Sequence, residues 1–395
     1  MKRIYLDHNA TTPVDPAVLD AMLPFFSGDF GNASSIHTFG QRARSAVEIA
    51  REQVAALINA RPQEIVFTSG GTESDNHAIF GIVANAQHGS VVSPHIITTA
   101  IEHEAVLNAC QALEKQGAAA TYLPVDHDGL VDLRELRKAI RPETALVTVM
   151  HANNELGTIQ PLAEIGQIAR DADIYFHTDA VQSARKIPID VKALQLDLLA
   201  LSGHKIYAPK GIGALFIKGG THLKQLLYGG HHQRGFRPGT ENVPGIVGLG
   251  KAAELARLAL ESDNIRLSAL RDKLEHGLLS SIPDAHANAA GAPRTPNTSN
   301  IVFPGIEGEA LIIALDLKGL ACSTGAACSS GAVEPSHVLT AIGLSTADAR
   351  SSIRFSLGSH TTEEEIAAAL EIVPTAVAQL RSISPEYHMQ ATALR

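Results

Sequence analysis

Apolar runs alternate with helical stretches between about residues 60 and 220 of the chain. Short runs rich in β-branched and aromatic residues predict strands at residues 64–68, 95–100, 145–150, 173–178, 197–201 and 213–217. Stretches with helical spacing separate several of these runs, as at residues 104–117 and 162–172. Strands that alternate with helices form mainly parallel sheets, and near-continuous apolar strands are typical of a sheet buried on both faces. The pattern therefore predicts an α/β fold.

The pattern changes beyond about residue 250. Residues 251–282 predict one long helix, which is followed by a strand at 299–305, a helix at 309–319 and a strand at 352–358. A loop rich in Gly, Ser and Ala, at residues 319–336, lies before the last strand. These elements predict a smaller α+β unit.

Composition narrows the classes of function. The 395 residues are enough for two to three domains, and hydrophobic and charged shares of 45% and 18% are those of a globular protein. A formal net charge of -9 argues against a nucleic-acid partner. No apolar run approaches the ~18–20 residues of a membrane span, and the N-terminus turns polar too early for a signal peptide. Three cysteines, Cys110, Cys322 and Cys328, are too few for a secreted disulfide framework, so we expect a cytoplasmic enzyme.

The first candidate for chemistry is TSGGTESDN, residues 68–76, which follows a predicted strand and opens a helical stretch. Gly70 and Gly71 would let the backbone approach a ligand, Thr72 supplies a hydroxyl, and a helix N-terminus there would hold a phosphate. A glycine-rich turn that merely starts a helix is an equal alternative. The motif matches neither a P-loop nor a GxGxxG fingerprint, which argues against ATP or nicotinamide chemistry.

Two charged residues follow later buried strands. Asp179, in HTDAVQS, is either a helix N-cap or an anion that keeps the ring nitrogen of a cofactor protonated. Lys205, in ALSGHKIYAPKG, is either a surface charge or an amine whose lowered pKa lets it form a Schiff base. A phosphate-holding turn, an Asp after one strand and a Lys after the next are together what a pyridoxal 5′-phosphate (PLP) site requires.

The loop CSTGAACSSG, residues 322–331, carries two cysteines in a stretch that looks flexible and exposed. Its small residues would let a thiol swing into a distant site. Zinc is disfavoured, because the spacing and the single remaining cysteine, Cys110, do not make a set of four ligands. From the residues alone, a structural thiol and a catalytic thiol are equally supported.

Taken together, the motifs resemble those of a known family. In the order seen in cysteine desulfurases of the nitrogen-fixation and iron–sulfur-assembly type, the chain has YLDHNATTP, TSGGTESDN, AIEHEAV, HANNELG, HTDAVQS, SGHKIYAPKG, RPGTEN, GAACSSGAVEPSHVL and SSIRFSLG. These are class V aminotransferase-like, PLP-dependent transferases of fold type I. The resemblance implies a large PLP-binding domain at residues 15–259 with a mainly parallel seven-stranded sheet. A small α+β domain, residues 1–14 and 260–395, would carry the mobile cysteine loop.

The resemblance also implies how the cofactor is held. Lys205 would form the Schiff base with PLP, Asp179 would pair with the ring nitrogen, and His103 would stack on the ring and move protons. The other cofactor ligands would be Gln182 at the phenolic oxygen of the ring, Asn154, the phosphate ligands Gly71, Thr72, Ser202 and His204, and Thr240 from the second subunit of a homodimer.

On the substrate side, the resemblance implies that Asn154 and Arg354 grip the carboxylate of L-cysteine. Cys328 aligns with the family's nucleophile and, as a thiolate, would take the sulfur as a persulfide and leave L-alanine, with His103 as the candidate base. A sulfur-acceptor or iron–sulfur scaffold protein would receive this sulfur. The resting enzyme would hold no metal, and Cys328 could serve as a transient iron–sulfur ligand.

Two alternatives stay open. A selenocysteine lyase, or a cysteine lyase that releases sulfide directly, would share the fold and the cofactor, and the product distinguishes them from a desulfurase. A scaffold that keeps the fold only to bind assembly partners is disfavoured, because Lys205, Asp179, Arg354 and Cys328 are present together.

The chain departs from the family pattern at two places. Cys322 stands where a small residue is expected; it lies near the end of the preceding predicted helix, so its reach should be short. Cys328 has small neighbours, and Pro335 beyond it can open a helix that anchors the far end of the loop.

The second departure is the pair His231 and His232, which precedes RGFRPGT. Solvated loop histidines are the simplest interpretation of this pair.

Overall fold

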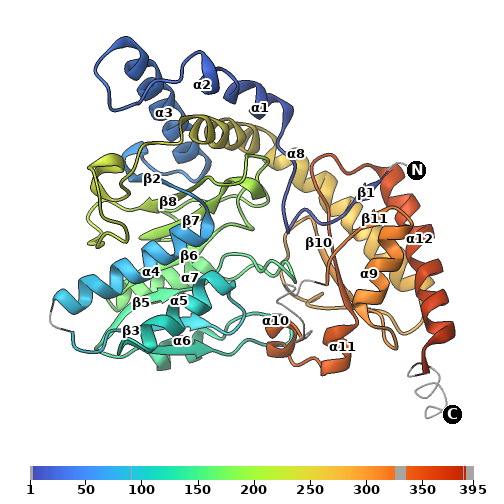
Figure 1. The fold of residues 1–395 in the computed structure, drawn as a ribbon. Helices are drawn as coiled ribbons and strands as arrows, with labels where there is room; N and C mark the ends of the chain where they lie inside the picture. Colours follow the sequence, from blue (N-terminus) through green and yellow to red (C-terminus); the bar gives the residue numbers. More distant parts are fainter. Residues whose placement is uncertain (1–2, 90, 325–334, 386, 388–395) are drawn as a thin grey trace.

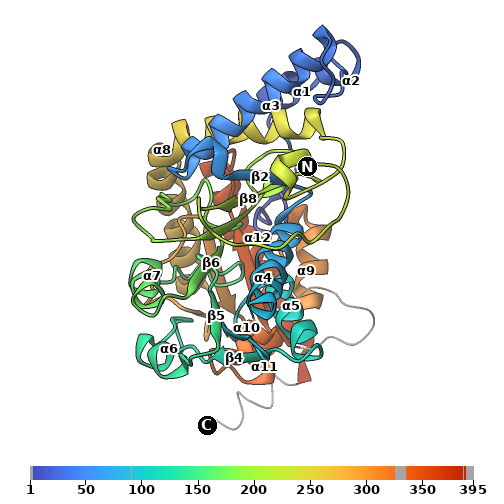
Figure 2. The same cartoon turned by 90° about the vertical axis from the view of Figure 1, so that its left-hand side faces the viewer.

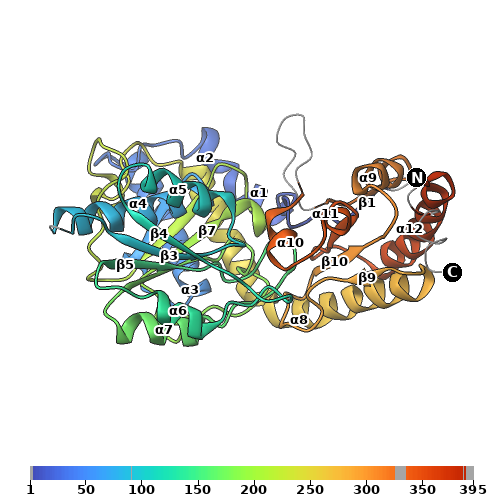
Figure 3. The same cartoon turned by 90° about the horizontal axis from the view of Figure 1, so that it is seen from below.

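The structure is a computed structural model that describes residues 3–89, 91–324, 335–385 and 387. Figure 1 shows a larger lobe built on a seven-stranded sheet and a smaller lobe around β10 (Thr298–Val302) and α9 (Gly308–Leu317). The long helix α8 (Val243–Ser281) runs through both lobes, as Figure 3 also shows from below. The division into domains at residues 14/15 and 259/260 stays a prediction.

The central sheet has the strand order β2-β8-β7-β6-β5-β3-β4. Its strands are β2 (Ile65–Thr68), β3 (His95–Thr99), β4 (Ala119–Leu123), β5 (Thr144–Thr148), β6 (Tyr175–Asp179), β7 (Leu198–Ser202) and β8 (Gly213–Ile217). Strand β8 is antiparallel to both of its neighbours, and the remaining pairs are parallel. The mainly parallel seven-stranded sheet is therefore confirmed, although the hydrophobic pattern did not predict β4.

Helices cover both faces of this sheet (Figures 2 and 3). On one face lie α4 (Gly71–His88) and α5 (Glu104–Glu114), and on the other lie α3 (Thr38–Leu57), α6 (Leu133–Ala139) and α7 (Leu162–Asp171). Alternate strand residues serve the two faces, so Val66 joins the core under α4 whereas Phe67 joins the core under α3. Cys110 of α5 is fully buried, and burial raises the pKa of its thiol to about 12, so its core position is confirmed.

Helix α8 begins at Val243 rather than at residue 251. The side chain of Asn242 caps it by accepting the N–H of Gly245, and a proline stands in the first turn. Glycine lowers helix propensity, and three glycines between Val243 and Lys251 hid this part of the helix. A Cβ on Gly250 would lie 2.5 Å from Cα of Ala50, so glycine lets α8 pack closely against α3.

The smaller lobe contains a three-stranded antiparallel sheet, β12 (Ser352–Ser356), β10 and β9 (His286–Ala287), and a parallel pair, β1 (Ile4–Tyr5) with β11 (Leu320–Ala321). The second half of α8, with α9 and α12 (Glu363–Ile383), packs on these strands. The remaining described helices are α1 (Pro16–Met22), α2 (Pro24–Ser27), α10 (His337–Ala341), α11 (Thr346–Arg350) and the 3-10 turns Pro62–Glu64, Gly203–Lys205 and His232–Gly235.

Helix α12 is the one helix in the described part of the chain whose length and composition would suit a membrane span. Its residues Ile366, Ala369 and Val373 are fully buried in the core of the smaller lobe. This packing accounts for its apolar character as that of a core helix.

Candidate active site

The predicted site residues gather at the edge of the sheet where the parallel strands end. They are Gly71 and Thr72 after β2, His103 after β3, Asn154 after β5, Asp179 at the end of β6, and Ser202, His204 and Lys205 at the end of β7. Arg354, on β12, reaches them from the smaller lobe. Thr240 is exposed on the loop before α8, and no hydrogen bond links it to these residues within the described chain. Cys328 lies outside the described residues.

The amine of Lys205 is held by backbone oxygens. Its Nζ donates to the oxygens of Asn9 and Ala10, the latter at 2.8 Å. Burial and the Arg354 cation lower the pKa of Lys205 to about 8, against the opposing effect of Asp179 and a second carboxylate. A fraction of Lys205 is therefore a neutral, nucleophilic amine at neutral pH.

Asp179 is a buried carboxyl group. Its Oδ1 accepts the N–H of Val181 at 2.8 Å, but a turn and not a helix follows, so Asp179 caps a turn and not the helix considered from the sequence. Burial raises the pKa of Asp179, whereas His103, the Val181 N–H and Lys205 favour the ionised form. A buried carboxylate needs a cationic partner, and a protonated ring nitrogen is such a partner. The capping role and the cofactor role are thus compatible.

The first turn of α4 begins at Gly71, which has no side chain, so the backbone of this turn borders the site. A Cβ on Gly71 would lie 2.8 Å from Cγ2 of Val181 and 3.6 Å from Cβ of Ser202, so the space suits glycine. The first N–H groups of a helix have no partner within the helix and favour an anion. His204 lies 3.1 Å from the Thr11 hydroxyl, and burial, with Lys205 and a second lysine, lowers the pKa of His204 to about 4. These groups fit a phosphate.

The structure brings Arg354 and Asn154 together, as predicted for residues that hold a substrate carboxylate. Arg354 Nη1 donates to the backbone oxygen of Asn154 at 3.1 Å, and Nη2 donates to Asp7 Oδ1 at 2.7 Å. Its buried Nε has no hydrogen-bond partner among the described atoms. Asp7 holds the guanidinium in place, and sequence reasoning did not identify this residue.

Behind Asp179 lies a group of buried side chains that sequence reasoning also missed. Glu102 accepts the Met150 N–H and a hydroxyl, and burial raises its pKa to about 8. His177 Nε2 lies 3.5 Å from Asp75 Oδ1; burial lowers the pKa of His177 to about 3 and raises the pKa of Asp75. His177 is therefore neutral near pH 7, and burial disfavours the ionised form of Asp75.

Cys322 is buried, so the expectation of an exposed stretch is wrong at this end of the cysteine loop. It follows β11, and the next residue, Ser323, pairs with Arg354 in an antiparallel bridge. Burial, reinforced by Asp7, raises the pKa of the Cys322 thiol far above its usual value. Cys322 is therefore a protonated thiol at neutral pH.

The far end of the loop is anchored by a serine. Helix α10 has Ser336 as its N-cap and His337 as its first residue, so Pro335 precedes the cap and does not open the helix as predicted. Ser336 Oγ donates to Glu155 Oε2 at 2.7 Å, and His337 Nε2 lies 2.9 Å from the backbone oxygen of Glu102. These contacts fix the end of the loop beside the site.

The described residues contain no group of three or more His, Cys, Asp or Glu side chains placed to hold a metal ion. His231 is exposed, as expected for a solvated loop histidine, whereas His232 is half-buried. Neither side chain belongs to the site residues described above.

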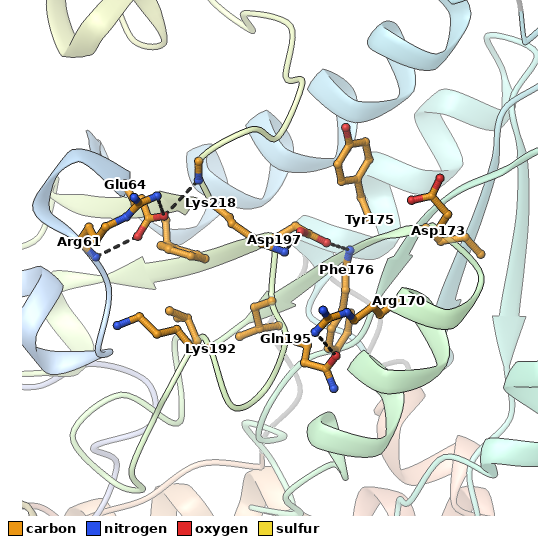
Figure 4. A pocket seen from close by; sticks show the side chains of 15 residues that line it. Arg61, Glu64, Arg170, Asp173, Tyr175, Phe176, Lys192, Gln195, Asp197 and Lys218 are labelled. Carbon is orange, nitrogen blue, oxygen red and sulfur yellow. Dashed lines mark hydrogen bonds and ion pairs between the residues drawn. The ribbon is translucent and has the colours of Figure 1, made fainter.

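A hollow of about 840 Å³ lies at the opposite edge of the sheet, where β6 and β7 begin (Figure 4). Two ion pairs lie in its lining, with Arg61 2.8 Å from Glu64 and Lys218 2.9 Å from Asp197. Because ligands of open α/β sheets bind beyond the carboxyl ends of the strands, this hollow is not the candidate active site.

Known proteins match the chain along nearly its whole length. The aminotransferase class-V family model matches residues 4–369. Cysteine desulfurase IscS of Methanosarcina thermophila is 52% identical over 385 residues, which cover 97% of this chain and 94% of that protein. A solved NifS-like protein has a TM-score of 0.88 and 38% identity, covering 96% of this chain and 100% of that one. The structure of SspA in complex with cysteine has a TM-score of 0.79 and 38% identity, covering 91% and 100%. The chain therefore belongs to the class-V aminotransferase family and, within it, to the cysteine desulfurases.

Proposed function

We propose that this chain uses PLP to remove sulfur from L-cysteine, releasing L-alanine and leaving a persulfide on Cys328. The observation that carries the proposal is the convergence of Lys205, Asp179 and Arg354 at one edge of the sheet. A reactive amine, a buried carboxylate and a guanidinium are the groups that PLP chemistry on an amino acid needs. Family membership and the cysteine bound to SspA, a structural relative, support the same substrate.

The site has a residue for each part of PLP. Lys205 would link to the cofactor, Asp179 would face the ring nitrogen, and Gln182 would donate to the phenolic oxygen. The phosphate would lie at the first turn of α4 beside Ser202 and His204. When bound, PLP supplies an electron sink for the charge that develops on the substrate carbon.

The residues of the chain would then act in sequence. Arg354 and Asn154 bind the substrate carboxylate and orient the amino acid. Lys205 takes the proton from the α-carbon once its amine is neutral, and His103 assists proton movement. The Cys328 thiolate attacks the substrate sulfur; an S–S bond forms as the Cβ–S bond breaks. The electron pair left on the substrate carbon takes up a proton, which completes L-alanine.

The test of this function is to incubate purified protein with L-cysteine. We expect L-alanine and a cyanide-reactive persulfide on the enzyme in equal amounts during the first turnover. Sulfide released without a protein persulfide would instead indicate the direct cysteine lyase. A strong preference for L-selenocysteine over L-cysteine would indicate the selenocysteine lyase.

Asp179→Asn separates the two roles of Asp179. An asparagine oxygen can still accept the Val181 N–H, but the side chain cannot carry the charge that stabilises a protonated ring nitrogen. A hydrogen bond to a charged group contributes about 1.5–3 kcal/mol, so we expect PLP affinity to fall by roughly 10- to 100-fold and turnover to slow. Titration of the cofactor-free protein with PLP measures the change. Near-normal affinity and turnover would leave Asp179 as a turn cap only.

The rate at which PLP attaches to the cofactor-free protein should rise with pH and reach half its maximum near pH 8. Attachment needs neutral Lys205, whose pKa is lowered to about 8 by burial and by Arg354. Removal of the Arg354 cation favours the ammonium form, so Arg354→Gln should move the midpoint to higher pH. Lys192→Gln, which removes an exposed cation, is the matched control and should leave the midpoint unchanged. An unshifted midpoint in Arg354→Gln would exclude this electrostatic effect.

We also propose that the chain works as a homodimer in which Thr240 completes the phosphate site of the neighbouring subunit. Helices α1–α3 project from the large lobe (Figures 1 and 2). Phe26 on α2, and Phe30 and Ile36 between α2 and α3, are apolar side chains exposed by 61%, 65% and 90%. Exposed apolar patches mark interaction surfaces. Phe30→Asp should shift sedimentation toward the monomer and lower activity, whereas Leu317→Asp, on α9, should remain dimeric. A fully active monomer would exclude the shared site.

The sulfur on Cys328 would pass to an acceptor, and an iron–sulfur scaffold protein is the acceptor that we propose. The name of the 52% identical relative supports this assignment. We place the reaction in the cytoplasm, where reducing conditions keep cysteine thiols free. Transfer of labelled sulfur from the loaded enzyme to a scaffold protein tests the step.

A further inference from the structure

Lys186 is a buried lysine beside the candidate site that the mechanism above does not use. It lies in the turn after β6, and its exposed fraction is 9%. Its Nζ donates to Asn9 Oδ1 and to Gln182 Oε1, each at 2.7 Å. No carboxylate among the described residues forms an ion pair with this amine. Burial, with the Lys205 and Arg354 cations, lowers the pKa of Lys186 well below its usual value.

The contacts of Lys186 determine which way the Gln182 amide points. A lysine ammonium can only donate, so the group of Gln182 that faces it must be the oxygen. The backbone oxygen of Asn9 can only accept, and Gln182 Nε2 donates to it at 3.0 Å. These two partners exclude the flipped amide. A neutral amine still has two N–H groups, so both bonds of Lys186 persist whether or not it is protonated.

The same amine and Asn297 together orient the side chain of Asn9, because Asn297 Nδ2 also donates to Asn9 Oδ1, at 3.1 Å. Asn9 Oδ1 faces Lys186, which leaves Asn9 Nδ2 to donate to the backbone oxygen of Asn154 at 3.0 Å and to Thr298 Oγ1 at 2.9 Å. The backbone oxygen of Asn9 also accepts from Lys205. Lys186 therefore belongs to a network that contacts the cofactor-linking lysine and the backbone that holds Arg354, and Asn297 keeps Asn9 in place without it.

We propose that Lys186 is a positioning residue that holds the amide of Gln182 with its nitrogen turned toward the phenolic oxygen of the cofactor. The inference rests on the proposed function, because the partner of Gln182 is part of the PLP site. Without Lys186, only the backbone oxygen of Asn9 still orients the Gln182 amide, and Gln182 Oε1 loses its donor. The amide is then held less firmly with its nitrogen toward the phenolate, which weakens the hydrogen bond to the cofactor. Lys186 acts through Gln182 and touches neither substrate nor cofactor.

A double-mutant cycle tests this role. Lys186→Met, Gln182→Leu and the double variant are prepared without cofactor and titrated with PLP, and the visible absorption band of bound PLP is recorded. We expect each single variant to bind PLP roughly tenfold more weakly, the magnitude of one lost hydrogen bond with its partner unsatisfied. The double variant should match Gln182→Leu in affinity and in band position, because Lys186 acts through that amide. Lys192→Met is the matched control and should behave as wild type.

Additive losses in the double variant would overturn the role, as would wild-type affinity in Lys186→Met, since both show that Lys186 does not act through Gln182. If Lys186→Met does not fold, Lys186→Gln replaces it in the cycle, because its shorter side chain remains polar but cannot span both oxygens. Wild-type protein that fails to bind PLP would overturn the proposed function as well. If the wild-type protein binds PLP and the losses of PLP affinity in the two single variants add up in the double variant, the role of Lys186 is overturned and the proposed function is not.

Discussion

Lys205→Ala is expected to abolish turnover, with release of L-alanine from L-cysteine reduced by at least about 10³-fold, the scale of a lost acid–base group. Its Nζ lies where the strand ends meet, and its pKa is lowered to about 8, so it can link to a carbonyl and move a proton near neutral pH. Lys186 is the other buried lysine nearby, but its amine is engaged by Asn9 and Gln182. We expect no second lysine to take over the linkage.

The linkage is measured apart from the activity. Wild-type protein loaded with PLP should absorb in the visible range, and borohydride reduction followed by mass spectrometry should place the label on Lys205. Lys205→Ala should lose both signals, whereas Lys192→Ala, at an exposed site, should keep them. A borohydride-reducible bond to PLP that persists in Lys205→Ala would show that another lysine carries the cofactor.

The buried part of the sheet was predictable because burial imposes a pattern on the sequence. All five residues of β7 are buried, and the first four are a continuous apolar run that ends at Ser202. Strand β4 has four half-buried residues, begins with two alanines and pairs only with β3 in the described sheet, so no apolar run is required of it. The start of α8 was hidden because glycines needed for its contact with α3 are poor helix formers.

Within the site, a residue could be predicted from the sequence when the nearby sequence gives its position, but not when its role depends on a partner far away along the chain. Asp179 and Lys205 could be proposed as neighbours because each lies at the end of a strand, and the ends of parallel strands meet at one edge. Asp7 could not, because it acts by pairing with Arg354 across 347 residues of chain. Lys186 was missed as well, because one of its two partners, Asn9, lies 177 residues away in the sequence. Local patterns carry no signal for such pairs, and only the fold brings them together.

The two loop cysteines are expected to differ sharply on substitution. Cys328→Ala should lower persulfide formation below about 1% of the wild-type level, because this substitution removes the nucleophile, while the absorbance of bound PLP stays intact. Cys322→Ala should keep most of the activity. Cys322 is 8% exposed, and burial with Asp7 raises the pKa of its thiol far above the usual value. Only a thiolate attacks sulfur, so Cys322 has almost no reactive form at neutral pH.

Labelled sulfur locates the acceptor directly. After a brief reaction of wild-type protein with sulfur-labelled L-cysteine, digestion under non-reducing conditions should place the label on the peptide that contains Cys328. Cys322→Ala is the matched control, since it removes a thiol of the same loop and should leave the label in place. Label on Cys322 in the wild type would overturn the assignment of Cys328 as the nucleophile. The buried thiol of Cys322 would then be the group that takes the substrate sulfur first.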